Sequence, residues 1–173
     1  MEKIVIVSDV NAGLDYIGRD PHIPVLRSVI NFGDEHLVDG IDITADQFYD
    51  RLLKKDTIPS TSAPTVGEAM ELIEKCINEG FTDLIMYSIS YQLSSIGQMV
   101  ETLRADFGTQ INIHVVDTKT AGYLQGYIAL TAKEMVDSGK SVSEIISYSN
   151  YLIENSHAYF VVDNLNYLVK NGR

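Results

Sequence analysis

Two short stretches of this sequence concentrate small hydroxyl side chains. The first, SISYQLSS at residues 88–95, holds four serines, and the second, PSTSAPT at residues 59–65, holds two serines and two threonines. Hydroxyls and backbone N–H groups can bind a carboxylate through several hydrogen bonds without a cation. The chemistry that these residue types favour is therefore binding of a carboxylate.

The second stretch is also restrained by its prolines. Pro64 disfavours the helical region for the residue before it, so Thr61 and Ser62 are expected on an extended, strand-like segment. Serine and threonine in such loops are more often turn residues than ligands, and both interpretations stay open for Thr61 and Ser62.

The elements that must position these side chains follow from hydrophobic patterning. Short apolar runs alternate with amphipathic segments of ten or more residues, which predicts an α/β fold with a mostly parallel sheet and helices on both faces. A strand at 23–32 is expected to lead into a hairpin, and 44–56 reads as a surface helix with Phe48, Leu52 and Leu53 on one side. The other expected strands are 3–9, 83–88, 111–117 and 158–163, and the other expected helices are 65–80, 95–108, 121–139, 141–156 and 164–172.

Polar clusters follow three of the expected strands, as SDVNAG, SISYQLSS and DTKTAG. Ligands of open parallel sheets bind beyond the carboxyl ends of the strands, so this rim is the expected site. An alternative is a small-molecule enzyme on the same rim with Asp9 or Asp117 as the base. Aspartates at strand ends are more often turn or helix-start ligands, which weighs against that alternative.

Four segments match the S/T-x-x-E/Q capping box that begins a helix. This ordinary structural role is the competing explanation for any serine or threonine near a helix start, and Ser95 is expected to be a plain cap. The pairs are Thr44 with Gln47, Thr65 with Glu68, Ser95 with Gln98, and Ser141 with Glu144.

Composition and missing motifs exclude several other functions. With a formal net charge of −11 and no basic cluster, nucleic acid is not an expected partner. No segment approaches the roughly 20 apolar residues of a membrane span, and the N-terminus does not resemble a signal peptide, so a cytoplasmic location is expected. The single cysteine, Cys76, is expected to be buried and inert.

No catalytic residue, metal or cofactor is expected from the motifs. The sequence has no G-x-S-x-G elbow and no phosphate-binding glycine loop. The four histidines, His22, His36, His114 and His157, lack the spacing of metal ligands.

Taken in order, the motifs resemble those of the DegV family. The counterparts of the family pattern are SDV with Asp9, DGIDI at 39–43, FYDRL, PSTSAP, SYQLSSIGQ, VVDTKTAG and DNLNYLVKNGR. The resemblance runs over essentially the whole chain and is most specific in DGIDI, FY and PSTSAP.

The resemblance implies a protein that binds a long-chain fatty acid and is not itself an enzyme. Carried over by position, the carboxylate ligands are Thr61 and Ser94, with Ser62 and Ser90 as neighbours of lower weight. Some family members present the carboxylate to a separate fatty acid kinase, so such a kinase is an expected partner.

The resemblance also bears on domain organisation. Residues 1–173 correspond to a single N-terminal α/β domain of the DegV type, and the family's second domain, which supplies most of the acyl tunnel and further head-group contacts, is expected to be absent. The exposed interdomain face would favour a homodimer. The alternative is a truncated interaction or self-association module without lipid-carrier activity.

Overall fold

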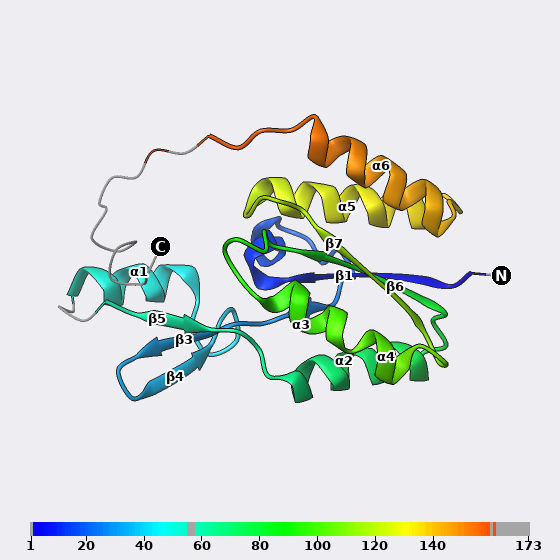
Figure 1. Cartoon of the computed structure of the whole chain (residues 1–173). Coiled ribbons are helices and arrows are strands. Elements are labelled where there is room, and N and C mark those ends of the chain that lie inside the picture. Colours follow the sequence, from blue (N-terminus) through cyan, green and yellow to red (C-terminus); the bar gives the residue numbers. More distant parts are fainter. Residues whose placement is uncertain (1, 55–57, 160, 162–173) are drawn as a thin grey trace.

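The computed structural model of the protein describes residues 2–54, 58–159 and 161. These residues form two sheets (Figure 1). Sheet A is fully parallel, with the order β2 (Val25–Leu26), β1 (Ile4–Asp9), β6 (Asp83–Ser88) and β7 (Asn112–Asp117). Sheet B is antiparallel, with the order β4 (Glu35–Val38), β3 (Val29–Phe32) and β5 (Ser60–Ser62).

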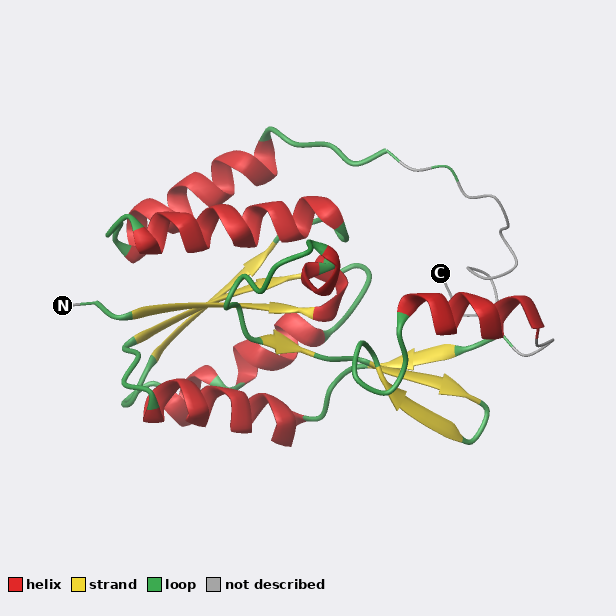
Figure 2. Ribbon diagram, turned by 180° about the vertical axis from the view of Figure 1, so that it is seen from behind, coloured by secondary structure: helices red, strands yellow, loops and turns green. Residues whose placement is uncertain are grey.

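Sheet A is covered by helices on both faces, as the sequence predicted (Figure 2). Every residue of β1 and β6 is buried, and alternate side chains enter two separate cores. Val5 and Val7 pack in one core with α2 (Val66–Asn78), α3 (Ile96–Thr102) and α4 (Arg104–Phe107). Ile4 and Ile6 pack in the other with α5 (Tyr123–Asp137) and α6 (Val142–Glu154). Two short 3₁₀ turns, η1 (Val10–Ala12) and η2 (Leu14–Tyr16), follow β1.

The strand expected at 23–32 is in fact two strands in different sheets. β2 pairs with β1, the chain leaves sheet A at Arg27 and Ser28, and β3 pairs with β4 and β5. The expected hairpin is present between β3 and β4, with Gly33 at a positive φ of 65°. Hydrophobic patterning cannot distinguish one long strand from two short ones, because a bend between sheets leaves the run of apolar residues unbroken.

The surface helix expected at 44–56 is α1 (Ala45–Lys54), which packs on sheet B, but its apolar face is narrower than predicted. Phe48 packs on Phe32 with 5.8 Å between ring centroids, next to Ile30 and Ile43. The expectation that Leu53 shares this face is wrong, because its side chain is 86% exposed.

The capping-box prediction holds at three of four helix starts. The Thr44 and Gln47, Thr65 and Glu68, and Ser141 and Glu144 pairs make both reciprocal hydrogen bonds. It is wrong at Ser95, which has φ −89° and ψ 4° instead of the extended conformation of a cap and makes no capping hydrogen bond. The helix expected at 95–108 is also interrupted at Leu103, between α3 and α4.

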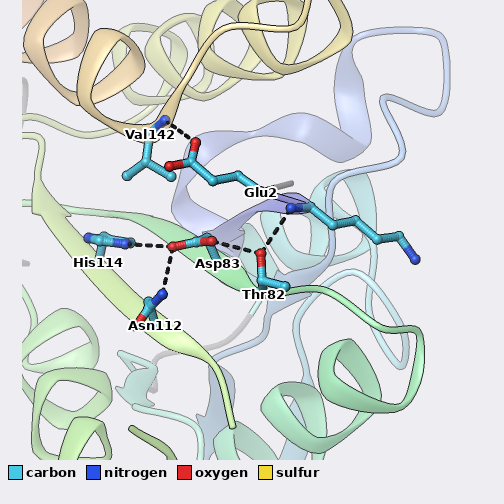
Figure 3. A network of polar contacts seen from close by, with 7 residues as sticks. Glu2, Thr82, Asp83, Asn112, His114 and Val142 are labelled. Atoms are coloured by element: carbon cyan, nitrogen blue, oxygen red, sulfur yellow. Dashed lines mark hydrogen bonds and ion pairs between the residues drawn. The ribbon is translucent and has the colours of Figure 1, made fainter. Parts of the chain in front are cut away.

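A polar network ties the strands of sheet A together at the edge where β6 and β7 begin (Figure 3). The Asp83 carboxylate accepts hydrogen bonds from Thr82 Oγ1, Asn112 Nδ2 and His114 Nε2 at 2.8, 3.0 and 3.3 Å. Burial would raise the pKa of Asp83, but these three hydrogen bonds together outweigh burial and lower it. The network lies at the opposite end of the sheet from the predicted site, so we assign it to strand registration.

The C-terminal elements expected from the sequence fall largely outside the described residues. Ala158, Tyr159 and Val161 are not in a strand, and the rest of the strand expected at 158–163 and the helix expected at 164–172 lie outside the described residues. No helix in the described part of the chain is long and apolar enough to cross a bilayer.

One tight contact holds α5 against the end of η1. A Cβ added at Gly126 would lie 2.4 Å from the backbone oxygen of Ala12. Gly126→Ala should therefore lower the free energy of unfolding by about 1–3 kcal/mol. Gly67→Ala on α2, where the nearest atom is 3.8 Å away, should instead leave stability unchanged or raise it by up to about 1 kcal/mol. Urea unfolding of the two variants tests this, and equal effects would contradict the assigned contact.

Cys76 is buried in the core under α2, and burial raises the pKa of its thiol to about 11. Because the thiolate is the reactive form, the native protein should react with Ellman's reagent many times more slowly than the unfolded chain at pH 8. Absorbance at the thionitrobenzoate band measures both rates. Rapid labelling of the folded protein would show that the α2 packing opens readily.

Candidate functional site

A cleft of about 380 Å³ lies between the carboxyl edge of sheet A and sheet B. It brings together three of the four predicted ligands, Thr61, Ser62 and Ser94, from segments distant in the sequence. Seven further residues line it, namely Asn11, Ser28, Asp39, Ala63, Ile89, Leu93 and Ser95.

The first hydroxyl pair is held by strand pairing. Thr61 of β5 lies opposite Ile30 of β3, and Ser62 lies opposite Val29. Asn31 Nδ2 also donates a hydrogen bond of 2.9 Å to Ser62 Oγ. The Ser62 hydroxyl therefore keeps its own proton to donate, while its position is fixed from the next strand.

The loop that carries Ser94 is anchored to the ends of two strands of sheet A. The buried Asp9 carboxylate at the end of β1 accepts a hydrogen bond from Ile89 N at 2.8 Å, just after β6. The N–H groups of Leu93 and Ser94 both donate to the Ser90 carbonyl, which closes a tight turn. Among the described residues, the one hydrogen bond of Ser94 Oγ is a long one of 3.4 Å accepted from Ile96 N, so the hydroxyl proton of Ser94 is available to a ligand.

Ser90, the fourth predicted residue, does not line this cleft. It lies on a second hollow of about 610 Å³, and its hydroxyl accepts a hydrogen bond from Gln92 N at 3.3 Å. Leu93 lines both the cleft and the hollow. The hollow has a largely apolar wall formed by Leu124, Ile128 and Ile153 of α5 and α6.

Asp9 and Asp117, the two candidate bases of the enzyme alternative, have backbone ligands. Asp9 Oδ1 accepts hydrogen bonds from Asn11 N and Nδ2, in addition to the Ile89 bond on Oδ2. Asp117 Oδ1 accepts from Lys119 N at 2.9 Å and from Tyr91 N at 3.3 Å. Both carboxylates therefore have the turn-stabilising roles that the sequence favoured.

Near the cleft, Arg27 forms an ion pair with Asp15. Its guanidinium makes two hydrogen bonds of 2.8 Å to the two oxygens of Asp15, and the pKa of Asp15 is lowered by this hydrogen bonding. Asp39 behaves differently, because burial raises its pKa and this effect outweighs the nearby Arg27 charge. Among the described residues that line the cleft there is one acid and no lysine, arginine or histidine.

The sequence did not identify three of the residues that contribute polar groups to the cleft. Asn11 and Asp39 stood within recognised motifs, SDVNAG and DGIDI, without an assigned role. Ser28 lay inside what was expected to be one strand, and only the bend between the sheets turns it toward the cleft. Across the part of the chain that the structure describes, no group of three or more His, Cys, Asp or Glu residues is arranged to hold a metal ion.

Solved structures share this architecture. The chain superposes with a TM-score of 0.87 on a protein described as DegV, a fatty acid binding protein from Bacillus subtilis, with 27% identity, covering 100% of this chain and 61% of that one. A fatty acid binding DegV family protein from Streptococcus agalactiae gives a TM-score of 0.84 at 26% identity, with the same coverage.

Sequence comparison agrees with the structural comparison. A DegV domain-containing protein of Staphylococcus aureus is 31% identical over 183 residues, which covers 99% of this chain and 60% of that protein. The chain thus spans about 60% of the length of the curated relatives that it matches. Residues 3–173 match the family described as "Uncharacterised protein, DegV family". The chain therefore belongs to the DegV family.

Proposed function

We propose that this chain binds a long-chain fatty acid and holds its carboxyl group in the cleft between the two sheets. Thr61 and Ser94 are the principal ligands, Ser62 assists them, and Ser90 lies beside the route of the acyl chain. The observation that carries the proposal is that Thr61, Ser62 and Ser94, all able to donate a hydrogen bond, line one cleft. The relatives from Bacillus subtilis and Streptococcus agalactiae, which are described as fatty acid binding, support the choice of ligand.

The second hollow supplies an apolar surface next to the cleft. An acyl chain that leaves the cleft past Leu93 would meet Leu124, Ile128 and Ile153. Each methylene buried there contributes about 0.8 kcal/mol. Chain length should therefore govern affinity, while the hydroxyl groups fix the position of the acid.

The proposal extends to how the lipid is used. Residues 1–173 act as the N-terminal α/β domain of a carrier, and the carboxyl group is presented to a separate fatty acid kinase, as the family resemblance implies. No residue of the chain is assigned a catalytic role, and the backbone ligands of Asp9 and Asp117 support that assignment.

Self-association is a second candidate, favoured by exposed aromatic pairs. Tyr123 stacks on Tyr127 along α5, and Tyr148 stacks on Tyr151 along α6, with between 43% and 83% of each residue exposed. Exposed aromatic side chains of this kind are typical of protein–protein interfaces. Sedimentation equilibrium distinguishes the two candidates, because a monomer that binds fatty acid argues against the interaction module.

Removal of single hydroxyls tests the carboxyl site. Thr61→Val and Ser94→Ala each delete one donor with little change of volume, and a hydrogen bond to a charged group contributes about 1.5–3 kcal/mol. Each variant should weaken dodecanoate binding by about tenfold or more, measured by calorimetric titration. Ser60→Ala is the matched control, since Ser60 is exposed on the same strand and is not among the residues that line the cleft.

Two results would count against the assignment. One is unchanged affinity in both Thr61→Val and Ser94→Ala. The other is an equal loss of affinity in Ser60→Ala, which would show that the substitutions act through β5 pairing and not through the ligand.

A further inference from the structure

A row of hydrogen bonds crosses sheet B and ends at the candidate cleft. His36 Nδ1 and Asn31 Oδ1 lie 2.6 Å apart, and Asn31 Nδ2 donates to Ser62 Oγ at 2.9 Å. The three residues belong to β4, β3 and β5, in the order of these strands across the sheet. Ser62 lines the cleft, whereas Asn31 and His36 are not among the residues that line it. The row therefore connects a side chain at the cleft with one that lies two strands away.

Strand register holds this row in place. Asn31 lies directly opposite His36, and it is two residues along β3 from Val29, which lies opposite Ser62. Because successive side chains of a strand point to opposite faces, His36, Asn31 and Ser62 share one face of sheet B. The other face packs on α1. The contacts among the three polar side chains are thus a consequence of the pairing that builds sheet B.

The chemistry of an amide gives the row a direction. A carboxamide has one acceptor end and one donor end, so Asn31 offers opposite hydrogen-bonding roles to its two neighbours. When His36 Nδ1 carries a proton, it donates to Asn31 Oδ1, Asn31 Nδ2 donates to Ser62 Oγ, and the Ser62 proton remains for a ligand. When His36 Nδ1 carries no proton, it accepts from Nδ2 of a turned amide, and Asn31 Oδ1 then takes the Ser62 proton.

We propose that His36 and Asn31 act as a relay that sets Ser62 to donate to a carboxylate in the cleft, so that protonation of His36 strengthens binding of the acid. This inference rests on the proposed function and adds to it regulation of the same site by a residue outside the cleft. His36 and Asn31 are positioning residues, because they do not line the cleft and act through Ser62.

The coupling has a definite sign. A doubly protonated imidazole always donates from Nδ1, whereas a neutral imidazole has two tautomers, one of which leaves Nδ1 without a proton. Histidine side chains ordinarily change charge between about pH 5 and 8. Affinity for the ionised acid should therefore rise as the pH falls through this range. The gain should reach at most about tenfold, since one hydrogen bond to a charged group is at stake.

Other charged side chains lie on the elements around His36. Glu35 lies opposite Phe32, on the face of sheet B that packs on α1, and pairs there with Arg51 at 2.8 Å. Asp34 lies in the exposed turn before β4, and Asp42, after β4, accepts a hydrogen bond from Val38 N. The residues of β3 and β5 on the same face as His36 do not titrate, and they are Val29, Asn31, Ser60 and Ser62. The titratable group of the row itself is thus His36.

Calorimetric titration with dodecanoate tests the coupling. The wild-type chain should bind up to about tenfold more tightly at pH 6 than at pH 8, and His36→Phe, which cannot titrate, should lose that dependence. His22→Asn removes another exposed histidine, paired with Asp20 and not among the residues that line the cleft, and should keep the wild-type profile. A pH dependence that persists in His36→Phe would overturn the relay and assign the effect to another group, such as Asp39 of the cleft lining.

A double-mutant cycle separates positioning from a structural effect on sheet B. Asn31→Asp presents acceptors to both neighbours, so it takes the Ser62 proton and should weaken dodecanoate binding by about tenfold. With Ser62→Ala already in place, the same change should have little further effect, because the donor is already gone. Equal losses in the two backgrounds would show that Asn31→Asp acts through its charge or through strand pairing, and would overturn the relay.

Nitrogen NMR of the imidazole reports the direction of the relay and needs no variant. In the dodecanoate complex at pH 8, neutral His36 should carry its proton on Nδ1, as the relay requires. A complex in which His36 carries its proton on Nε2 would overturn the inference. This measurement decides even if a variant fails to fold.

Failure of the relay is distinguishable from failure of the proposed function. Absence of dodecanoate binding by the wild type at every pH from 6 to 8 would reject fatty-acid binding and the relay with it. Binding without a pH profile that depends on His36 would leave fatty-acid binding intact and reject only the relay.

Discussion

The candidate site depends on the antiparallel pairing of β5 with β3. This pairing places Thr61 and Ser62 on a sheet that projects from the carboxyl edge of sheet A (Figure 1), where they share a cleft with Ser94. The pairing exists because the chain leaves sheet A at Arg27 and Ser28 and continues as β3. Without that exit the apolar run would have stayed in one sheet, and PSTSAPT would have had no strand to pair with.

The opposite wall of the cleft is held by a different kind of interaction. Asp9 is fully buried, and each of its carboxylate oxygens accepts a hydrogen bond from backbone N–H, one from η1 and one from Ile89. A buried carboxylate is stable only when its hydrogen bonds are satisfied, so the end of β1 and the start of the Ser94 loop are tied together. The ion pair of Arg27, the residue after β2, with Asp15 makes a similar link to η2. Contacts within the protein therefore fix both sides of the cleft without a ligand.

In the proposed function, a protein with net charge −11 binds an acid in a cleft whose described lining carries hydroxyl groups and no cation. Hydroxyl groups provide hydrogen-bond donors without positive charge, and Thr61, Ser62 and Ser94 all line this cleft. An acyl chain bound as proposed would gain affinity from apolar contacts beyond Leu93, independently of charge.

Local sequence patterns determined the strands β1, β6 and β7 of sheet A, both hydroxyl clusters and the caps at Thr44, Thr65 and Ser141, because apolar periodicity and capping depend on residues close together in the chain. The same patterns indicated the rim where the candidate site lies and, through the motif order, the family. Only the tertiary structure decided that 23–32 divides between two sheets, that Ser95 is not a cap, that Ser90 lies on a separate hollow and that Asp39 and Ser28 line the cleft. These features depend on strand pairing between distant segments and on the burial that follows from it, neither of which is encoded in local spacing.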